Sequence, residues 1–281
     1  MGKAGGKGRV TLPKDLGELG LASPEIEAKF DIPNRAGLAA LKELVGSTIT
    51  LIDSGNQPVE FVCTMDKESL YLDTCFDTKS FRLFQGGRMV RARQRYDLGG
   101  GSGPEYRFKK AVVQAKTAQA THTSFHPAVM ARDEIRSTEK FTSPEAFAAR
   151  LPELLAPGSR DKAVFAVRKG LAETKKLKPV LEIRDDRFFM RLSKKGKHDP
   201  SVPSFFVSLD AVRYQGLLGK CGHAEGLYLE AEIIDEMTTL SSRQLRSMLA
   251  LLNSLAAYLE RRGLTPSNIS KYEAGLRLTV L

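Results

Sequence analysis

Three short segments of the sequence carry charged side chains at every second position. In the first segment, 25–30, the residues between the charges are apolar. Because successive side chains of a β-strand point to opposite faces, each segment would gather its charges on one face of a strand. Carboxylates grouped in this way suit hard divalent cations, and grouped Arg or Lys suit phosphate oxygens. The charged residues are Glu25, Glu27 and Lys29 in the first segment, Arg91 and Arg93 in the second, and Glu230 and Glu232 in the third.

The three segments together restrict the kind of sheet that can hold them. A half-exposed strand with its charges in water explains any one of them. If one sheet carried all three on the same face, that face would be too charged for a core, whereas a closed barrel with a wet, charged lumen would accommodate it. Burying many ionisable groups is costly unless each finds a partner. The pattern therefore favours a closed barrel with a charged interior.

Two other stretches have the spacing of helices. Ser143 and Pro144 form a cap followed by proline in the first turn, and they open an amphipathic pattern that runs to Leu154. A longer pattern of leucines runs from near Ser241 to Arg262 and stops at Gly263. Both are predicted to be packing elements.

Composition limits the class of protein. The chain has 281 residues, 42% of them hydrophobic, and a formal net charge of +10, which excludes a disordered chain. No apolar stretch approaches the roughly 20 residues of a membrane-spanning helix. The N-terminus lacks the apolar core of a secretory signal. The positive charge by itself fits a nucleic acid, a membrane surface or an anionic small molecule. We expect a cytoplasmic protein without a membrane partner.

The motifs and their order resemble those of the CYTH superfamily, also called triphosphate tunnel metalloenzymes. Segment 25–29 is similar to the ExExK signature of that family. Segment 71–93 resembles the stretch in which a YxDT-type strand leads through a short helix into a strand with RxR. Segment 229–232 resembles the second ExE strand, and 270–275 resembles the terminal SKYERG segment with Ala274 in place of the arginine. The resemblance spans residues 23 to 277.

The resemblance implies an α+β fold: a closed, antiparallel, eight-stranded β-barrel, or tunnel, with flanking helices. We expect a Gly/Lys-rich tail over 1–20 and a single domain over 21–281. The chain exceeds the usual family length, chiefly through a predicted helical insertion near 117–176.

The resemblance also implies the site and its cofactor, which would be Mg²⁺ or Mn²⁺. Ala115 and Gln114 before Lys116 depart from the TLK-like strand of the family, and Arg187 is preferred over Arg184 as the next phosphate-facing arginine. The implied catalytic residues are Glu25, Glu27 and Lys29. The implied phosphate-binding residues are Lys29, Arg91, Arg93, Lys116, Arg187 and Lys271. The implied metal ligands are Glu25, Glu27, Asp210, Glu230 and Glu232.

The activity implied by the resemblance is metal-dependent hydrolysis of a triphosphate, either inorganic triphosphate or the triphosphate tail of an organic substrate. Three alternatives stay open: conversion of ATP to cyclic AMP by a class IV adenylate cyclase, binding of polyphosphate without turnover, and binding of nucleic acid. The expected partner is a triphosphate-containing small molecule. A nucleic acid is expected only as a 5′-triphosphate end, and the protein is expected to be a monomer or a homodimer.

Overall fold

The computed structural model describes residues 24–99, 105–120, 125–168, 176–196, 204–233 and 242–281. The predicted tail over 1–20 lies outside the described residues. The strands are β1 (Pro24–Asp31), β2 (Thr48–Ile52), β3 (Pro58–Asp77), β4 (Met89–Leu98), β5 (Tyr106–Ala120), β6 (Val129–Arg136), β7 (Lys178–Lys194), β8 (Phe205–Gly216), β9 (His223–Ile233) and β10 (Thr265–Pro266). The helices are α1 (Arg35–Lys42), α2 (Arg82–Gln85), α3 (Pro144–Leu154), α4 (Lys162–Arg168), α5 (Ser242–Arg261) and α6 (Lys271–Thr279).

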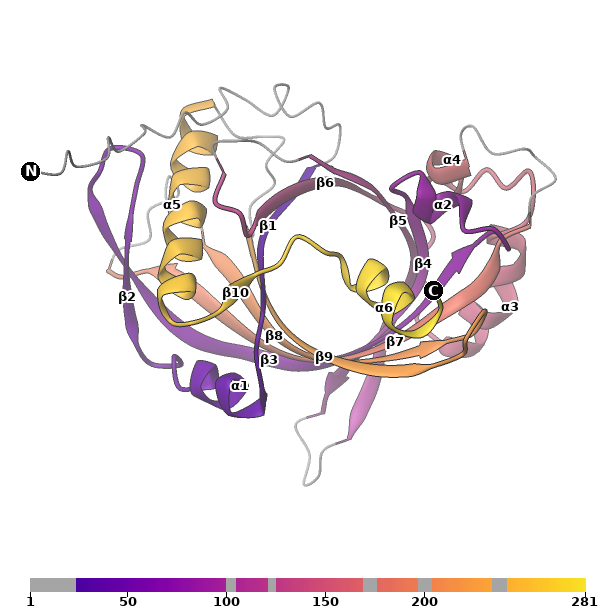
Figure 1. The fold of residues 1–281 in the computed structure, drawn as a ribbon, viewed down its shortest axis with the longest axis horizontal. Coiled ribbons are helices and arrows are strands. Elements are labelled where there is room, and N and C mark those ends of the chain that lie inside the picture. Colours follow the sequence, from indigo (N-terminus) through magenta and orange to yellow (C-terminus); the bar gives the residue numbers. More distant parts are fainter. Residues whose placement is uncertain (1–23, 100–104, 121–124, 169–175, 197–203, 234–241) are drawn as a thin grey trace, which may run out of the picture.

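Eight of the strands close into a ring. β1 pairs with β6, and the ring continues through β5, β4, β3, β7, β8 and β9, which pairs with β1 again. Every neighbouring pair is antiparallel. Figure 1 looks through this ring, with helices around it. The predicted eight-stranded antiparallel barrel with flanking helices is therefore confirmed.

β1 shows how the sequence makes a strand with two different faces. Ile26, Ala28 and Phe30 are buried in an apolar core that also contains Leu249 and Leu252 of α5. The alternate residues of β1 point to the inside of the ring, which we call the lumen. Because apolar side chains leave water on the outer face, α5 packs there and the ionic residues are directed inward.

Both helices predicted from capping and spacing are present. The Ser143 hydroxyl accepts a hydrogen bond from the Ala146 N–H at 3.1 Å, and Pro144 is the first residue of α3. α5 spans Ser242–Arg261, and Gly263 after it has a φ of 87°, a left-handed conformation that glycine adopts without strain. α3 and α4 pack beside β4 and β5 over a second apolar core (Figure 1).

The segment near 117–176 holds more than the predicted helical insertion. It contains α3 and α4, but also β6, which pairs with both β1 and β5. The ring would not close without this strand. The segment therefore contributes to the barrel wall as well as to its helical covering.

α6 lies across one opening of the ring (Figure 1). It begins after Ser270, whose hydroxyl accepts a hydrogen bond from the Glu273 N–H at 3.1 Å. The helix approaches the strands closely, because a Cβ on Gly275 would lie 2.7 Å from side-chain atoms of Leu181 and Tyr214. This packing places the first residues of α6 at one end of the lumen.

Among the described residues, no helix combines the length and apolar character needed to cross a membrane.

Candidate functional site in the barrel lumen

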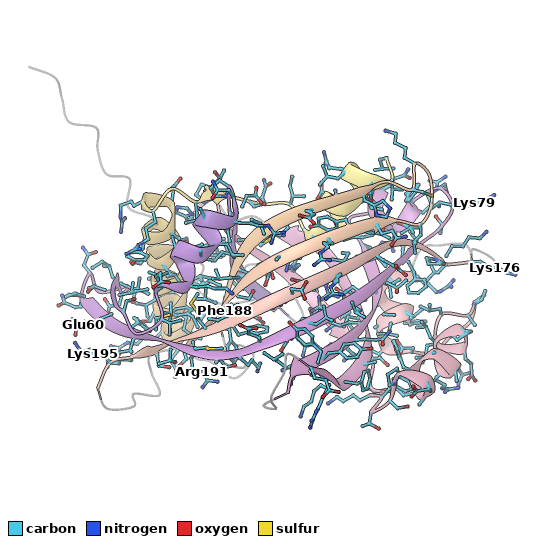
Figure 2. The ribbon with its side chains drawn as sticks, turned by 90° about the horizontal axis from the view of Figure 1, so that it is seen from below. Glu60, Lys79, Lys176, Phe188, Arg191 and Lys195 are labelled. Atoms are coloured by element: carbon cyan, nitrogen blue, oxygen red, sulfur yellow. The ribbon has the colours of Figure 1, made fainter. Side chains whose placement is uncertain are left out.

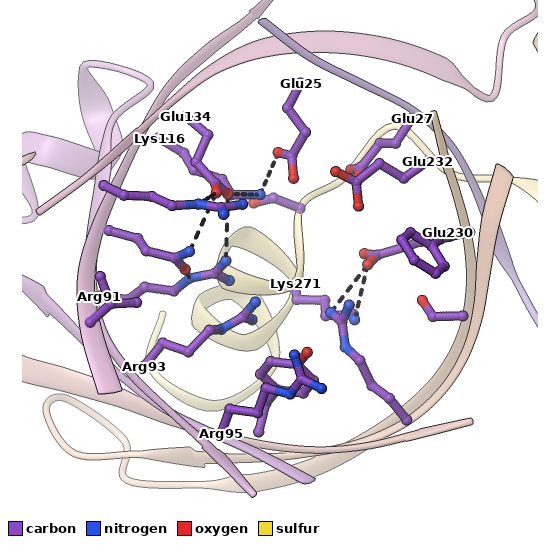
Figure 3. A pocket seen from close by; sticks show the side chains of 18 of the residues that line it. Glu25, Glu27, Arg91, Arg93, Arg95, Lys116, Glu134, Glu230, Glu232 and Lys271 are labelled. Atoms are coloured by element: carbon purple, nitrogen blue, oxygen red, sulfur yellow. Dashed lines mark hydrogen bonds and ion pairs between the residues drawn. The ribbon is translucent and has the colours of Figure 1, made fainter. Parts of the chain in front are cut away.

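The ring encloses a cavity of about 400 Å³. Strands of the ring and the start of α6 line it, and Figure 3 shows charged side chains projecting into it from several sides. Eleven basic side chains line the cavity, against five acidic ones. The acidic ones are Glu25, Glu27, Glu134, Glu230 and Glu232. The lumen thus has an excess of positive charge that its own lining carboxylates do not balance.

Most of the residues predicted for the site meet in this cavity, although they are far apart in the sequence. Nine of the eleven line it: Glu25, Glu27, Arg91, Arg93, Lys116, Arg187, Glu230, Glu232 and Lys271. The remaining two, Lys29 and Asp210, lie behind the lining.

Lys29 is covered by the segment that leads into α6. Its ammonium group donates to the Ile269 carbonyl at 2.8 Å, lies 3.7 Å from Glu230, and sits 4.5 Å from the Tyr228 ring centroid. Burial lowers the pKa of Lys29 to about 8, even though Glu230 acts in the opposite direction. The strand alternation points Lys29 inward as predicted, but the chain entering α6 separates it from the open lumen.

Asp210 is fully buried beneath Lys271, whose ammonium group donates to its carboxylate. The Ser208 hydroxyl donates to the same carboxylate at 3.2 Å. Burial raises the pKa of Asp210 to about 6, although Arg187 opposes the shift. In this arrangement Asp210 supports the Lys271 side chain and does not face the cavity.

The carboxylates of β1 and β9 are crowded together. Glu27 and Glu232 are directly opposite each other in the β1–β9 ladder. Burial, followed by the charges of Glu25 and Glu27, raises the pKa of Glu232 to about 8. Burial also raises the pKa of Glu27, because the carboxylates of Glu230 and Glu25 add to it and Arg132 compensates only in part. Within this group of carboxylates, which we call the acidic wall (Glu25, Glu27, Glu230 and Glu232), Glu27 and Glu232 therefore lack compensating positive charge.

Arg132 on β6 is the cation that joins two members of the acidic wall. Its guanidinium donates to Glu25 at 3.0 Å and also to Glu27. Lys116 contacts Glu25 from the other side, at 2.5 Å, and lies 2.9 Å from Glu134. These contacts are drawn in part in Figure 3. With Lys116 and Arg132 opposing the effect of burial, the pKa of Glu25 is lowered.

The wall formed by β3 and β4 has the opposite balance of charge. Asp73 accepts two hydrogen bonds from Arg93, at 2.7 and 2.6 Å, and one from Arg91 at 3.2 Å. Burial alone would raise the pKa of Asp73, but Arg93 and Arg91 outweigh it and lower the pKa to about 2. Arg91 is also held by Gln114 at 2.9 Å. Asp73 thus fixes two arginines that face the cavity.

A third cluster lies where β7 meets α6. Lys271 donates to Asp185 at 2.8 Å and to Glu230 at 3.3 Å. Arg187 donates to the same two carboxylates, at 2.7 and 3.2 Å. Burial opposes ionisation of Asp185, yet Arg187 and Lys271 lower its pKa. Arg184, the arginine not chosen from the sequence, is exposed and pairs with Asp186.

Sequence reasoning missed several residues of this network: Asp73, Arg132, Glu134 and Asp185. A signal for β6 was present, because Arg132, Glu134 and Arg136 alternate in the same way as the charges of β1. Asp73 lay inside a recognised motif but was not given a role. Asp185 is two residues from Arg187, so strand alternation places both on one face.

The residues that could hold a divalent cation are the carboxylates of the acidic wall. Carboxylate oxygens suit Mg²⁺ and Mn²⁺, and the mutual repulsion of Glu27 and Glu232 would be relieved by an added cation. In the described ranges, no three acidic, histidine or cysteine side chains already converge as a metal site. These carboxylates therefore suit a divalent cation in two respects: they offer oxygen ligands, and their negative charge is only partly compensated.

Comparison with solved structures gives the fold an independent reference. HpAC1 from Hippeastrum, a proposed adenylyl cyclase with a dominant triphosphatase activity, superposes with a TM-score of 0.52 over 92% of this chain and 97% of its own, at 15% identity. The chain has the tunnel fold. The resemblance seen in the sequence is thus confirmed at the level of architecture.

Two other structures are similar over comparable lengths but superpose less well. The PH1819 protein from Pyrococcus horikoshii gives a TM-score of 0.47 at 12% identity, covering 90% of this chain and 98% of its own. A proposed adenylate cyclase from Bacillus halodurans gives 0.43 at 14% identity, covering 89% of this chain and 96% of its own. No protein-family model and no curated protein sequence matches the chain.

Proposed function

We propose that this protein hydrolyses a triphosphate inside the tunnel with the help of a divalent cation. The observation that carries the proposal is the unequal charge of the lumen, with eleven basic side chains against five acidic ones. A triphosphate brings roughly four to five negative charges at neutral pH, because each terminal phosphate is largely ionised. The buried carboxylates of Asp73, Asp185 and Asp210 offset part of this excess. A bound triphosphate together with a divalent cation would balance the rest. The activity of the Hippeastrum protein, which shares the fold, agrees with this proposal.

The phosphate chain would be held by the basic residues opposite the acidic wall. Arg91 and Arg93 are fixed by Asp73, and Arg187 is fixed by Asp185, so their guanidinium groups need little reorganisation when substrate enters. Arg can bind two phosphate oxygens at once, which orients the substrate. Lys116 would add a further positive charge from β5.

The cation would be held by Glu25, Glu27 and Glu232. When bound, it would withdraw charge from the phosphate oxygens and favour attack by water on the phosphorus. Glu230 is less suited to this role, because Lys271 and Arg187 both donate to its Oε2 and, acting against burial, hold its pKa well below the usual range. Positioning and electrostatic stabilisation account for the chemistry, so no covalent nucleophile is required.

Lys29 has a supporting place in this scheme. It binds the chain just before α6 and lies beside Glu230, so it fixes the helix that carries Lys271. Asp210 acts in the same way from below Lys271. Both residues would influence catalysis through the position of Lys271.

The decisive experiment is a phosphate-release assay with product analysis. The purified protein is incubated with tripolyphosphate, ATP, thiamine triphosphate or pyrophosphate, with Mg²⁺, Mn²⁺ or EDTA. Phosphate release from at least one triphosphate, lost in EDTA, is the expected result. Cyclic AMP and pyrophosphate as the only products from ATP, or no turnover of any triphosphate, would contradict hydrolysis.

A further inference from the structure

β4 leads from α6 toward the opposite end of the lumen. Its first residue, Met89, packs in one apolar cluster with Tyr272 and Leu276 of α6. Arg95 follows six residues later, which corresponds to about 20 Å along a strand, and its side chain still lines the cavity. Figure 2 shows β7 running in the same way, from the end near Lys176 toward Lys195. The lining of β4 therefore reaches from the helix to the far end of the lumen.

The two ends differ in their access to solvent. At the α6 end, Lys271 and Tyr272 line the cavity and are only 7% and 4% exposed. Figure 3 shows α6 behind the charged side chains. Lys110, which is directly opposite Arg95 in the β4–β5 ladder, lines the same cavity but is exposed. A residue that both lines the cavity and meets water marks an opening, so the lumen opens to solvent on the side away from α6.

Basic side chains surround this opening. Arg136 lines the cavity from the end of β6, and its side chain is 61% exposed. Lys140 is also exposed and lines the cavity, and the bridge between Ala111 and Phe141 holds its segment against β5. We call this cluster the basic mouth. Its members are Arg95, Lys110, Arg136 and Lys140.

The basic mouth is only partly neutralised by its own surroundings. Arg95 pairs with Asp97 at 2.7 Å, and Arg136 pairs with Glu134 at 2.5 Å. Neither lysine forms an ion pair or a side-chain hydrogen bond within the part of the chain that the structure describes. The inner cations differ in this respect, because carboxylates hold Arg93 and Arg187 in place.

The cations of the basic mouth also repel one another. Like charges directly opposite each other in a ladder destabilise a sheet, and Arg95 and Lys110 have this relation. Partial burial, followed by the charges of Arg95, Arg136 and Lys140, lowers the pKa of Lys110, and Asp97 opposes this shift. An anion that arrived between these side chains would relieve the repulsion.

We propose that the basic mouth is the entry site of the tunnel, where long-range attraction captures a polyanion before its phosphates reach Arg93. Arg93 is two residues from Arg95, or about 7 Å along the strand, which is within one Debye length at physiological ionic strength. Basic residues around a cleft raise the association rate of an anion even where each contact is weak. This inference rests on the proposed function, because it takes a triphosphate as the ligand, and it adds the route of entry.

The test removes the two unpaired cations in Lys110→Gln/Lys140→Gln. Association and dissociation rate constants for tripolyphosphate are measured by stopped-flow tyrosine fluorescence in EDTA, since the chain has seven tyrosines and no tryptophan and Tyr71 lines the cavity. At low ionic strength the association rate constant should fall about tenfold, and at about 0.5 M salt the difference should shrink to about twofold. The dissociation rate constant should change by less than about twofold.

Calorimetric titration in the same buffers measures the affinity without an optical signal. Its Kd should rise by the same factor as the association rate constant falls. With Mg²⁺ present, kcat for phosphate release should stay within about twofold of the wild type, because steering acts before the chemical step.

A matched variant removes two lysines at the α6 end. Lys178 and Lys220 are both exposed, Lys178 begins β7, and the Lys220 N–H donates to the Val280 carbonyl just after α6 at 3.4 Å. Lys178→Gln/Lys220→Gln therefore changes the net charge equally but leaves the basic mouth intact. Its association rate constant should stay within about twofold of the wild type.

Three results would overturn the entry site: an unchanged association rate in the mouth variant, an equal loss in the α6-end variant, or a loss confined to the dissociation rate. The proposed function is judged separately by phosphate release. If tripolyphosphate binds without being hydrolysed, hydrolysis fails and the association rates still decide the entry site. If tripolyphosphate does not bind, both proposals fail.

Discussion

Asp73 on β3 and Glu232 on β9 are both carboxylates inside the same ring, yet their surroundings shift them in opposite directions. Although both are buried, Arg93 and Arg91 lower the pKa of Asp73 to about 2, whereas burial together with Glu25 and Glu27 raises the pKa of Glu232 to about 8. The charged neighbours of Asp73 are mainly cations, whereas those of Glu232 are mainly other carboxylates. Local charge balance, and not burial, therefore distinguishes the two walls.

The lumen thus contains two kinds of carboxylate: those that hold a cationic side chain in place, and those that remain available to bind a ligand. Asp73 and Asp185 accept hydrogen bonds from arginine or lysine, and they hold those cations toward the cavity. Glu232 makes no side-chain hydrogen bond or ion pair within the described part of the chain. A barrel in which every charged side chain was paired would have little affinity for either a polyanion or a metal ion. Because the excess positive charge and the excess negative charge lie on different walls, the lumen has affinity for both.

The largest effect is expected from changing the acidic wall at Glu27. Glu27→Gln removes a proposed cation ligand while keeping side-chain volume, and it should lower kcat for metal-dependent phosphate release by about a thousandfold, or about 4 kcal/mol. The measurement is phosphate release at saturating tripolyphosphate, with circular dichroism to show that the fold persists. Glu225→Gln, on an exposed part of β9, is the matched control and should retain activity. Full activity in Glu27→Gln would remove Glu27 from the mechanism.

The next largest effect is expected at Asp73, which holds two arginines in place, and it is measured as a change in the free energy of unfolding. Asp73→Asn leaves Arg91 and Arg93 without their shared carboxylate, and should lower the free energy of unfolding by about 3 kcal/mol at neutral pH. Because the folded pKa of Asp73 is about 2, below its ordinary value of 3.8, its contribution is present above about pH 4 and is lost as pH falls toward 2. Urea unfolding at several pH values should show the two proteins converging in acid. A gap that stays constant with pH would contradict the charge pairing.

Glu232 should show the reverse pH dependence. Its folded pKa of about 8 is above the ordinary 4.5, so the folded state is favoured at low pH and loses stability as pH rises through 8. In EDTA, Glu232→Gln should therefore be more stable than the wild type above about pH 8, by about 2 kcal/mol, and should match it near pH 4. Thermal melts measure the difference. Mn²⁺ should narrow it at high pH by neutralising the wild-type carboxylates. A less stable variant at high pH would show that Glu232 is already paired.

The sequence predicted which face of a strand each charged residue occupies, but not the ion pairs that these residues form with neighbouring strands. The alternation of charged and apolar residues in 25–30 predicted β1 and its two faces, because strand geometry alone determines them. The pairing of Glu25 and Glu27 with Arg132 was not predicted, because it depends on the register between β1 and β6, which are about 100 positions apart in the chain. Asp73 was missed for a similar reason, since its importance comes from the two arginines of the neighbouring strand.

The smallest effect tests the choice between two arginines on one strand. Arg187→Lys keeps the positive charge beside Asp185 but removes the planar fork that can bind two phosphate oxygens, so KM for the triphosphate should rise about tenfold, or about 1.4 kcal/mol. Arg184→Lys is the matched control, because Arg184 is three residues away, exposed, and paired with Asp186 outside the lumen. Its KM should stay within about twofold of the wild type, as expected for an exposed ion pair. Initial-rate kinetics over a range of substrate concentrations measure both. If KM in Arg187→Lys also stays within about twofold of the wild type, Arg187 acts through its positive charge alone, and it attracts the substrate without orienting it.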